Sequence, residues 1–131
     1  MKTIDDLLKT PYWVIDILPK QVPMNSPGQY FRIENYLLKA RIGEIKQQHI
    51  NLILKLNCYL DISMDDEPEI NPAAELIDKT MRTRYVNIRI GDALIVSEPD
   101  DTNLTMFNAN KELLKLVRLL ASAEGLFVWR T

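Results

Sequence analysis

The feature that most constrains the fold is residues 42–64, because their apolar residues follow two periodicities in succession. Six side chains fall on one arc of a helical wheel: Ile42, Ile45, His49, Leu52, Ile53 and Leu56. Lys46 is the one charged residue that falls on this apolar arc. Over residues 52–62, apolar and polar residues alternate instead, as they do in a half-buried strand.

Both periodicities cannot hold over the whole stretch. A single strand over residues 50–64 would far exceed the usual length of about five or six residues. We therefore predict a helix over residues 42–56 and a strand over residues 58–64. Asn57, between them, can adopt the left-handed conformation that ends a helix.

Size and composition limit the class of protein. The chain has 131 residues, 47% of them hydrophobic and 26% charged, which suits one domain, residues 1–131, with an ordinary core. The single cysteine, Cys58, excludes an internal disulfide and fits a reducing compartment. No apolar stretch approaches the ~20 residues that span a bilayer, and the first residues do not resemble a signal peptide. We expect a cytoplasmic protein that is not inserted into a membrane.

The charge and the missing motifs exclude several functions. The net charge is −2, whereas sequence-independent binding of nucleic acid needs a surplus of Lys and Arg. The four glycines are isolated, so no phosphate-binding loop is present, and there is no Gly-x-Ser-x-Gly motif. We expect no nucleic-acid partner and no cofactor.

Other segments predict short strands and helices around the long helix. Helices are expected over residues 4–9, 73–82 and 109–124, capped by Thr3, Asn71 and Asn108. Strands are expected over residues 12–18, 103–107 and 126–129, and a hairpin over residues 85–97 turns at Gly91 and Asp92. A two-residue turn there would pair Ile90 with Ala93, Ile88 with Ile95 and Val86 with Ser97. Because its polar stripe is narrow, the last helix should be deeply packed, and Gly125 should end it.

Residues 29–38 are ambiguous. Ser26, Pro27 and Gln29 resemble the start of a helix, whereas the density of aromatic and β-branched residues favours a strand. We predict a strand that pairs with residues 12–18. The fold class is then α+β: a single, mostly antiparallel sheet of about six strands, with the long helix and the C-terminal helix packed on one face.

Two acidic turns stand out as candidate binding surfaces. Their seven residues are Asp65, Asp66, Glu67, Glu69, Glu98, Asp100 and Asp101. They do not follow the spacing of a calcium-binding EF-hand loop, and prolines among them are typical of solvated turns. Their functional interpretation is an electronegative surface that docks a protein partner with a basic surface.

The only histidine and the only cysteine are predicted to be structural. His49 projects from the apolar face of the long helix, and no nucleophile or orienting acid stands at a fixed spacing from it. Cys58 follows a helix C-terminus, which does not activate a thiol, so we expect it to be buried. One histidine and one cysteine cannot fill a usual zinc site, and we expect no metal.

A ligand pocket is the alternative interpretation. Asp16, His49, Tyr59 and Asp61 could line it if their side chains converged within hydrogen-bond reach. Trp13 and Trp129, in the first and last expected strands, would then either pack at the rim of the core or form a pocket wall.

Three segments carry a resemblance to known sequences: VIDILPKQVP at residues 14–23, LNCYLDIS at 56–63 and AEGLFVWR at 123–130. With them the chain resembles a small family of bacterial proteins without an assigned activity. The resemblance spans most of the chain and implies no catalytic residue.

The function hypothesis from the sequence is therefore a non-catalytic interaction or regulatory module. An immunity-type inhibitor or the subunit of a complex would dock through the acidic turns. The alternative is a small ligand-binding protein or a carboxylate- and histidine-based enzyme at the pocket described above. The sequence leaves the oligomeric state open.

Overall fold

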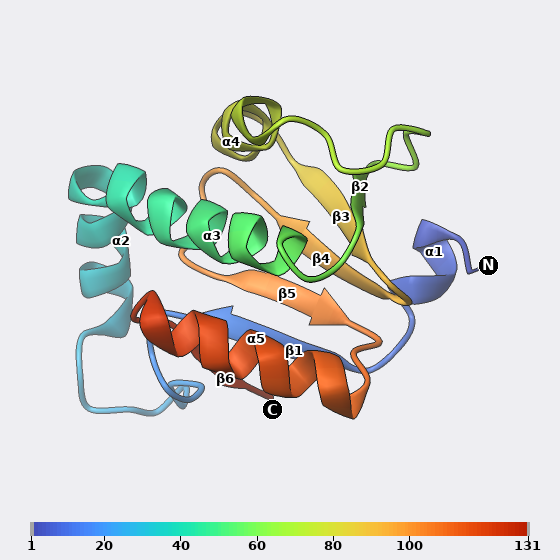
Figure 1. The fold of residues 1–131 in the computed structure, drawn as a ribbon. Coiled ribbons are helices and arrows are strands. Elements are labelled where there is room, and N and C mark those ends of the chain that lie inside the picture. The colour runs from blue at the N-terminus through green and yellow to red at the C-terminus, as the bar shows by residue number, and fades with distance from the viewer. Residues whose placement is uncertain (1, 131) are drawn as a thin grey trace.

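The computed structural model describes residues 2–130 as one antiparallel six-stranded sheet with helices, and it confirms the predicted α+β class (Figure 1). The strands are β1 (Tyr12–Asp16), β2 (Ile62–Met64), β3 (Val86–Ile90), β4 (Ala93–Ser97), β5 (Leu104–Phe107) and β6 (Phe127–Trp129). The helices are α1 (Ile4–Leu7), α2 (Tyr30–Ala40), α3 (Ile42–Asn57), α4 (Ala74–Thr83) and α5 (Lys111–Ala123). The strand order in the sheet is β2-β3-β4-β5-β1-β6.

The hairpin of β3 and β4 has the predicted register. Val86 pairs with Ser97, Ile88 with Ile95, and the turn begins at Gly91 with a φ of 57°. That left-handed conformation costs glycine nothing, because glycine has no Cβ. The matched apolar faces across the pair therefore set the register, as alternation requires.

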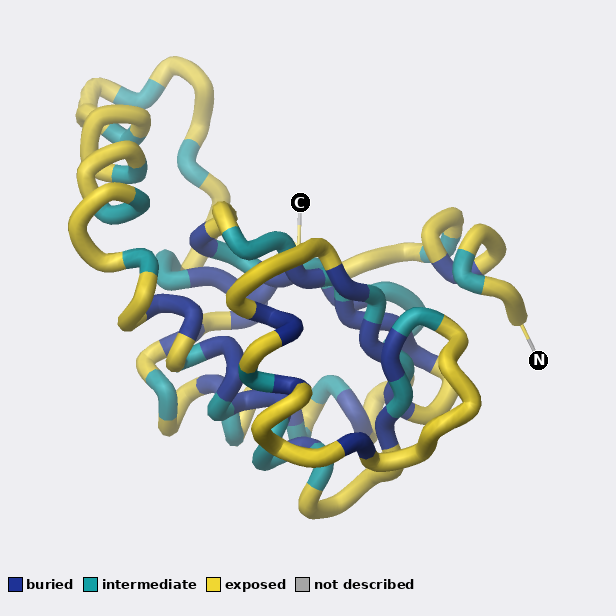
Figure 2. Tube along the Cα trace, turned by 90° about the horizontal axis from the view of Figure 1, so that it is seen from above, coloured by how far each residue is buried: buried dark blue, intermediate teal, exposed yellow. Residues whose placement is uncertain are grey.

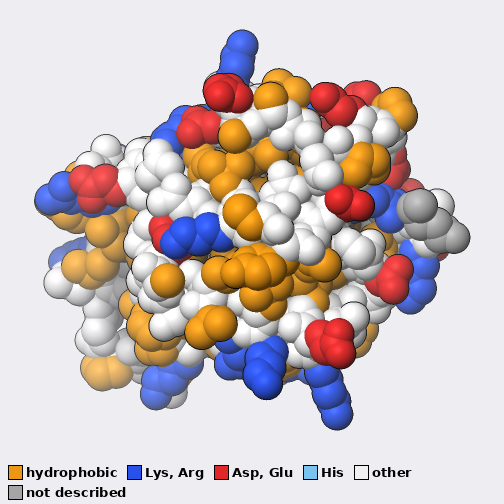
Figure 3. Space-filling view, in the orientation of Figure 1, with side chains coloured by type: hydrophobic (Ala, Val, Ile, Leu, Met, Phe, Trp, Pro, Cys, Tyr) orange, Lys and Arg blue, Asp and Glu red, His pale blue; other side chains and the backbone are white. Residues whose placement is uncertain are grey.

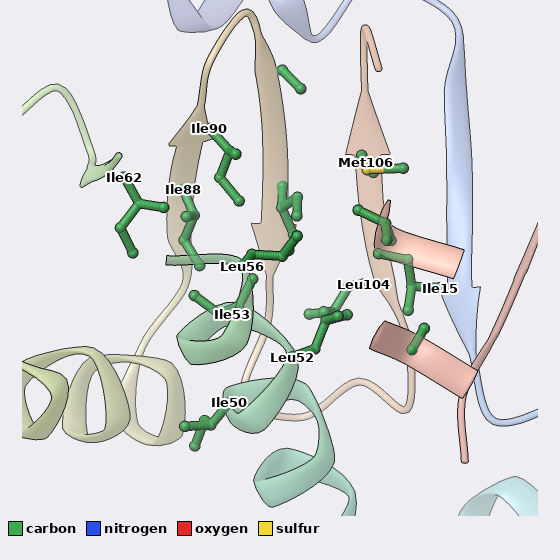
Figure 4. Packing of buried hydrophobic residues seen from close by; sticks show 14 of the residues in the cluster. Ile15, Ile50, Leu52, Ile53, Leu56, Ile62, Ile88, Ile90, Leu104 and Met106 are labelled. Atoms are coloured by element: carbon green, nitrogen blue, oxygen red, sulfur yellow. The ribbon is translucent and has the colours of Figure 1, made fainter. Parts of the chain in front are cut away.

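One face of the sheet carries the core. In Figure 1, α3 and α5 lie side by side across this face. Their buried side chains and those of the strands form one hydrophobic cluster. Figure 4 shows Leu52, Ile53 and Leu56 of α3 pointing toward Ile88 and Leu104 of the sheet. All five side chains are fully buried, so their packing removes apolar surface from water and stabilises the contact between α3 and the sheet.

The helix-to-strand transition after α3 occurs as predicted, but its details differ. The helix ends at Asn57, and Cys58 continues with right-handed dihedral angles, so no left-handed residue ends it. The following strand is shorter than predicted, because residues 58–61 form a turn before β2. Cys58 is exposed, and the prediction of a buried thiol was wrong: this turn carries it past the edge of the core.

The prediction of a strand over residues 29–38 was wrong, because this segment forms α2. Its half-buried residues Tyr30, Glu34 and Leu37 recur with helical spacing, a pattern that the aromatic content obscured. The edge of β1 that the strand would have used pairs with β6 instead. Figure 2 shows α2 standing away from the body of the molecule, with no buried residue along it.

Helix caps differ from the predicted residues in two places. The N-cap of α4 is Ala73, and the N-cap of α5 is Asn110, whose side chain accepts a hydrogen bond from the Leu113 amide at 2.8 Å. Asn71 and Asn108 instead adopt left-handed dihedral angles in the preceding turns, which asparagine tolerates. Thr3 caps α1 as predicted, and Gly125 follows α5 with a φ of 76°.

The C-terminal helix is less buried than its composition predicts. Of its residues, only Leu113, Val117 and Ala121 are fully packed, and Leu119 is 70% exposed. The prediction of deep packing was wrong, since α5 lies on the open side of a two-layer fold. Figure 3 shows hydrophobic side chains gathered at the surface in the region between α3 and α5.

Candidate functional site

The first acidic turn is largely engaged by arginines of the same chain. Arg84 forms an ion pair with Asp65 at 2.6 Å, and Arg89 forms one with Asp66 at 2.8 Å. Asp65 also accepts a hydrogen bond from the Asn87 amide at 2.9 Å. These two carboxylates therefore attach the turn to β3.

The other two acids of this turn, Glu67 and Glu69, are exposed and form no ion pair with any residue from 2 to 130. They line a surface hollow of about 240 Å³ beside α4, together with Leu76 and Arg84. Half of the predicted acidic residues of this turn thus stay available to a partner, and half do not.

The second acidic turn lies at the end of the sheet where α2 also lies. Ser97 ends β4, Leu104 begins β5 and Asp16 ends β1, and the strand pairings bring these three positions to one end of the sheet. Glu34 of α2 joins them, because it lines a small hollow together with Asp16 and Thr102. We call this surface the acidic end and define it by five residues: Asp16, Glu34, Glu98, Asp100 and Asp101.

The acidic end is not neutralised by ion pairs. Within residues 2–130, none of its five carboxylates lies within salt-bridge distance of a Lys or Arg nitrogen. Burial raises the pKa of Asp101, and the charges of Glu34 and Asp100 raise it further, against the opposing effect of Lys46. The carboxylates thus repel one another, and a cation brought to this surface would relieve that repulsion.

Asp16 is the buried member of the acidic end, with 6% of its surface exposed. Its carboxylate accepts hydrogen bonds from the Ile17 amide at 2.7 Å and from Nε1 of Trp129 at 3.3 Å. Burial is the main cause that raises its pKa, and these hydrogen bonds oppose the rise. Its side chain faces the hollows beside α2, so a ligand entering there meets a fixed carboxylate.

Beneath the second acidic turn, α3 buries a lysine next to the histidine. Lys46 is 2% exposed, and its Nζ lies 3.1 Å from Nδ1 of His49. Burial lowers the Lys46 pKa to about 8, against the attraction of Asp101, Glu98 and Asp100. Burial and the neighbouring Lys46 lower the His49 pKa to about 3, so the imidazole is neutral at pH 7.

His49 is not arranged as a catalytic base. An ammonium group can only donate, so Nδ1 accepts from Lys46 and the ring proton lies on Nε2. Neither Nε2 of His49 nor Oγ of the buried Ser97 has a hydrogen-bond partner within the described chain, so the two do not form a nucleophile–base pair. His49 is fully buried, as the sequence predicted.

The four residues of the alternative pocket do not come together. Asp16 bonds to Ile17 and Trp129, and His49 bonds to Lys46, whereas Asp61 accepts from Asn71 at 2.9 Å beyond the other end of α3. Tyr59 is exposed in the same distant turn. No hydrogen bond among residues 2–130 joins any two of the four.

Sequence reasoning missed three residues that the structure places at this end of the sheet. Tyr30 and Glu34 are joined by a hydrogen bond of 2.7 Å across one turn of α2, and they were missed with the helix itself. Lys46 had a visible signal, because it interrupts the apolar arc of α3. A lysine on the apolar face of a helix either extends its ammonium group to solvent along its aliphatic chain or is buried with a hydrogen-bond partner.

No described group of three or more His, Cys, Asp or Glu side chains in residues 2–130 is placed to hold a metal ion. None of the helices in that range is long and apolar enough to cross a membrane. Comparisons with protein-family models, with curated proteins and with solved structures gave no match.

Proposed function

We propose that this protein is an interaction module that docks a partner with a basic surface through the acidic end. The observation that carries the proposal is the group of five carboxylates at one end of the sheet, none of them in an ion pair within residues 2–130. Carboxylates gathered on one surface repel one another, and only the buried Lys46 opposes that repulsion from within residues 2–130, so a basic partner would lower this cost on binding.

The neighbouring helix supplies the apolar part of such an interface. Phe31 and Tyr36 of α2 are 77% and 60% exposed, and the helix buries none of its residues. Aromatic side chains next to a charged surface are typical anchors of protein interfaces, because they bury a large area with few rotatable bonds. The acidic end would steer the partner, and α2 would hold it.

This arrangement supports an inhibitor or complex subunit better than an enzyme. The one buried histidine lacks a partner that could make it a general base. The first acidic turn is the weaker candidate surface, because Asp65 and Asp66 are paired with Arg84 and Arg89. We therefore place the docking surface at the second turn.

Charge reversal at the second turn tests the proposal. The variant Glu98→Lys with Asp100→Lys changes two acids that make no side-chain hydrogen bond or ion pair in residues 2–130, so the fold should be retained. Affinity capture from the lysate of the native cell should yield a partner with the wild-type protein and lose it with this variant. Binding of that partner should also weaken steeply as salt is raised, because salt screens charge pairs beyond about 8–10 Å.

The matched control changes the same charge in the first turn, through Glu67→Lys with Glu69→Lys. This control should capture the same partner as the wild type. Equal loss in both variants would show that only net charge matters. Equal capture by wild type and by the Glu98 and Asp100 variant would overturn the proposal.

A further inference from the structure

The hollow beside Asp16 has the chemistry of a site for one cationic side chain. It measures about 200 Å³, below the roughly 300–1,000 Å³ of pockets for drug-sized ligands. Its lining combines one carboxylate, two aromatic rings, two side-chain amides and two aliphatic residues: Asp16, Trp129, Tyr30, Gln21, Asn103, Leu18 and Val22. A nucleotide or a large cofactor is too big for it.

The Asp16 carboxylate has acceptor capacity left. Its oxygens accept hydrogen bonds from the Ile17 amide and from the Trp129 indole, and the Leu18 amide adds a third, weaker stabilising contact. A carboxylate can accept about four, and no Lys or Arg of residues 2–130 pairs with Asp16. A buried negative charge with free acceptor positions favours a ligand that brings positive charge and N–H donors together.

The two tryptophans of the chain differ in a way that points to the same ligand. Two guanidinium groups of the same chain lie over the ring of Trp13: those of Arg118, at 5.0 Å from the ring centre, and Arg130, at 5.2 Å. Trp129, by contrast, has no such cation over its ring within the described residues. Trp129 has the buried carboxylate beside it, so its ring is better prepared for a cation than that of Trp13.

We propose that this hollow binds an arginine side chain of the basic partner, which makes it the anchoring point of the docking surface proposed above. The guanidinium would donate to Asp16 and stack on Trp129 or Tyr30, since it is planar and carries several N–H donors. Glu34 would add attraction, because its charge already acts on Asp16. The inference rests on the proposed docking of a basic partner.

The test uses Nα-acetyl-arginine methylamide as the probe and the citrulline analogue, which has the same shape without the charge, as its control. In the ¹⁵N-labelled protein, the arginine probe should shift the indole N–H signal of Trp129 in a saturable way and leave that of Trp13 in place. The citrulline analogue should bind at least about tenfold more weakly, because it lacks the positive charge that strengthens the hydrogen bonds to the Asp16 carboxylate. Equal shifts from both compounds, or no shift of Trp129 with either, would overturn the proposal.

Three variants locate the site. Asp16→Asn should weaken binding of the arginine probe at least about tenfold, whereas Asp92→Asn, with the same change of charge in the distant β3–β4 turn, should not alter it. Gln21→Glu adds a carboxylate at an exposed position of the lining and should tighten binding, so the proposal stays testable even if the Asp16 variant does not fold. Unchanged binding of the arginine probe by the Asp16 variant, or by the Gln21 variant if the Asp16 variant does not fold, would contradict the proposal.

The outcome is separable from that of the docking proposal. If the Glu98 and Asp100 variant loses the partner but Trp129 does not respond to arginine, the docking proposal is supported and the pocket proposal is wrong. If Trp129 responds to arginine but the charge reversal does not affect partner capture, the pocket proposal is supported and the docking proposal is wrong.

Discussion

Two consecutive helices, α2 and α3, separated only by Arg41, have opposite relations to the rest of the molecule. Seven residues of α3 are buried; the helix contacts α4 and α5, and its buried apolar side chains share one core cluster with those of the sheet. No residue of α2 is buried; the helix contacts α3, and its half-buried side chains line the hollows beside Asp16. Both segments form helices, but α3 is held by the core through its buried residues, whereas α2 buries none of its residues and keeps most of its surface exposed.

The largest expected difference between the two helices is in the cost of removing an apolar side chain. Leu56→Ala in α3 should lower the free energy of unfolding by about 2–5 kcal/mol, because Leu56 is fully buried and a cavity would remain. Urea denaturation, monitored by tryptophan fluorescence, measures this. A loss below about 1 kcal/mol would show that α3 is not anchored as the structure shows.

The second prediction concerns the buried charge of α3. Lys46→Met should raise the free energy of unfolding by about 2 kcal/mol at pH 7, because methionine removes a buried ammonium whose pKa is lowered from its ordinary 10.5 to about 8. The loss of the hydrogen bond to His49 offsets part of the gain. The Lys39→Met variant of the exposed face of α2 is the matched control and should leave stability unchanged.

The pH dependence gives the same prediction an independent readout. From pH 8 toward pH 10.5, the unfolded chain keeps the Lys46 proton that the folded protein loses, so stability of the wild type should rise with pH. Tyr30, whose pKa is raised by burial and by Glu34, opposes this rise only above about pH 10. Lys46→Met should abolish the rise between pH 8 and about 10, and an unchanged rise would contradict the assignment.

The third prediction tests what holds α3 against α5. Glu124, at the end of α5, accepts from Asn51 and from Lys55 at 2.7 Å each, and its backbone carbonyl accepts from Gln48. Gly125→Ala should cost about 1–2 kcal/mol, because its φ is 76° and the added Cβ would lie 3.3 Å from Nε2 of Gln48.

The matched control for that variant is Gly43→Ala, in the first turn of α3. A Cβ there would meet no atom within 4 Å, so the variant should be neutral or stabilise the protein by up to about 1 kcal/mol through helix propensity. Urea denaturation of the two variants should therefore shift the midpoint in opposite directions. Shifts in the same direction would show that the left-handed position is not the constraint.

The smallest effect is expected in α2. Phe31→Ser should change the free energy of unfolding by less than about 0.5 kcal/mol, because the ring is 77% exposed. Native-state hydrogen exchange should show the amides of α2 exchanging much faster than those of α3, since few contacts oppose local opening. Equal protection of the amides of both helices would contradict the prediction that α2 opens more easily than α3.

The sequence predicted those parts of the fold in which one periodicity dominates. The α3 helix and the β3–β4 register followed from their apolar spacing, and the mostly antiparallel sheet of about six strands followed from the short strand segments around them. The α2 helix was missed because strand propensity at its aromatic residues outweighed a weak helical stripe. The pairing of β6 with the edge of β1 joins segments that are far apart along the chain, and local propensity cannot predict such a pairing.

The candidate site was predictable only in part, for a similar reason. The acidic residues were visible in the sequence, but Arg84 and Arg89, which pair with Asp65 and Asp66, are about twenty residues away along the chain and become neighbours through the β2–β3 pairing. The sequence also placed Asp16 on a strand without showing that Trp129 and Tyr30 would stand beside it. Such a site is assembled by tertiary structure.

The exposure of Cys58 offers a practical route to experiments on this molecule. It is the only cysteine, and it lies just beyond α3 at the end away from Lys46, which is roughly 18 Å distant at 1.5 Å of rise per residue. A fluorophore or spin label attached to this thiol would report from the turn that directly follows α3 while leaving the acidic end untouched. The native chain can therefore be followed as it meets a partner without engineering a new attachment point.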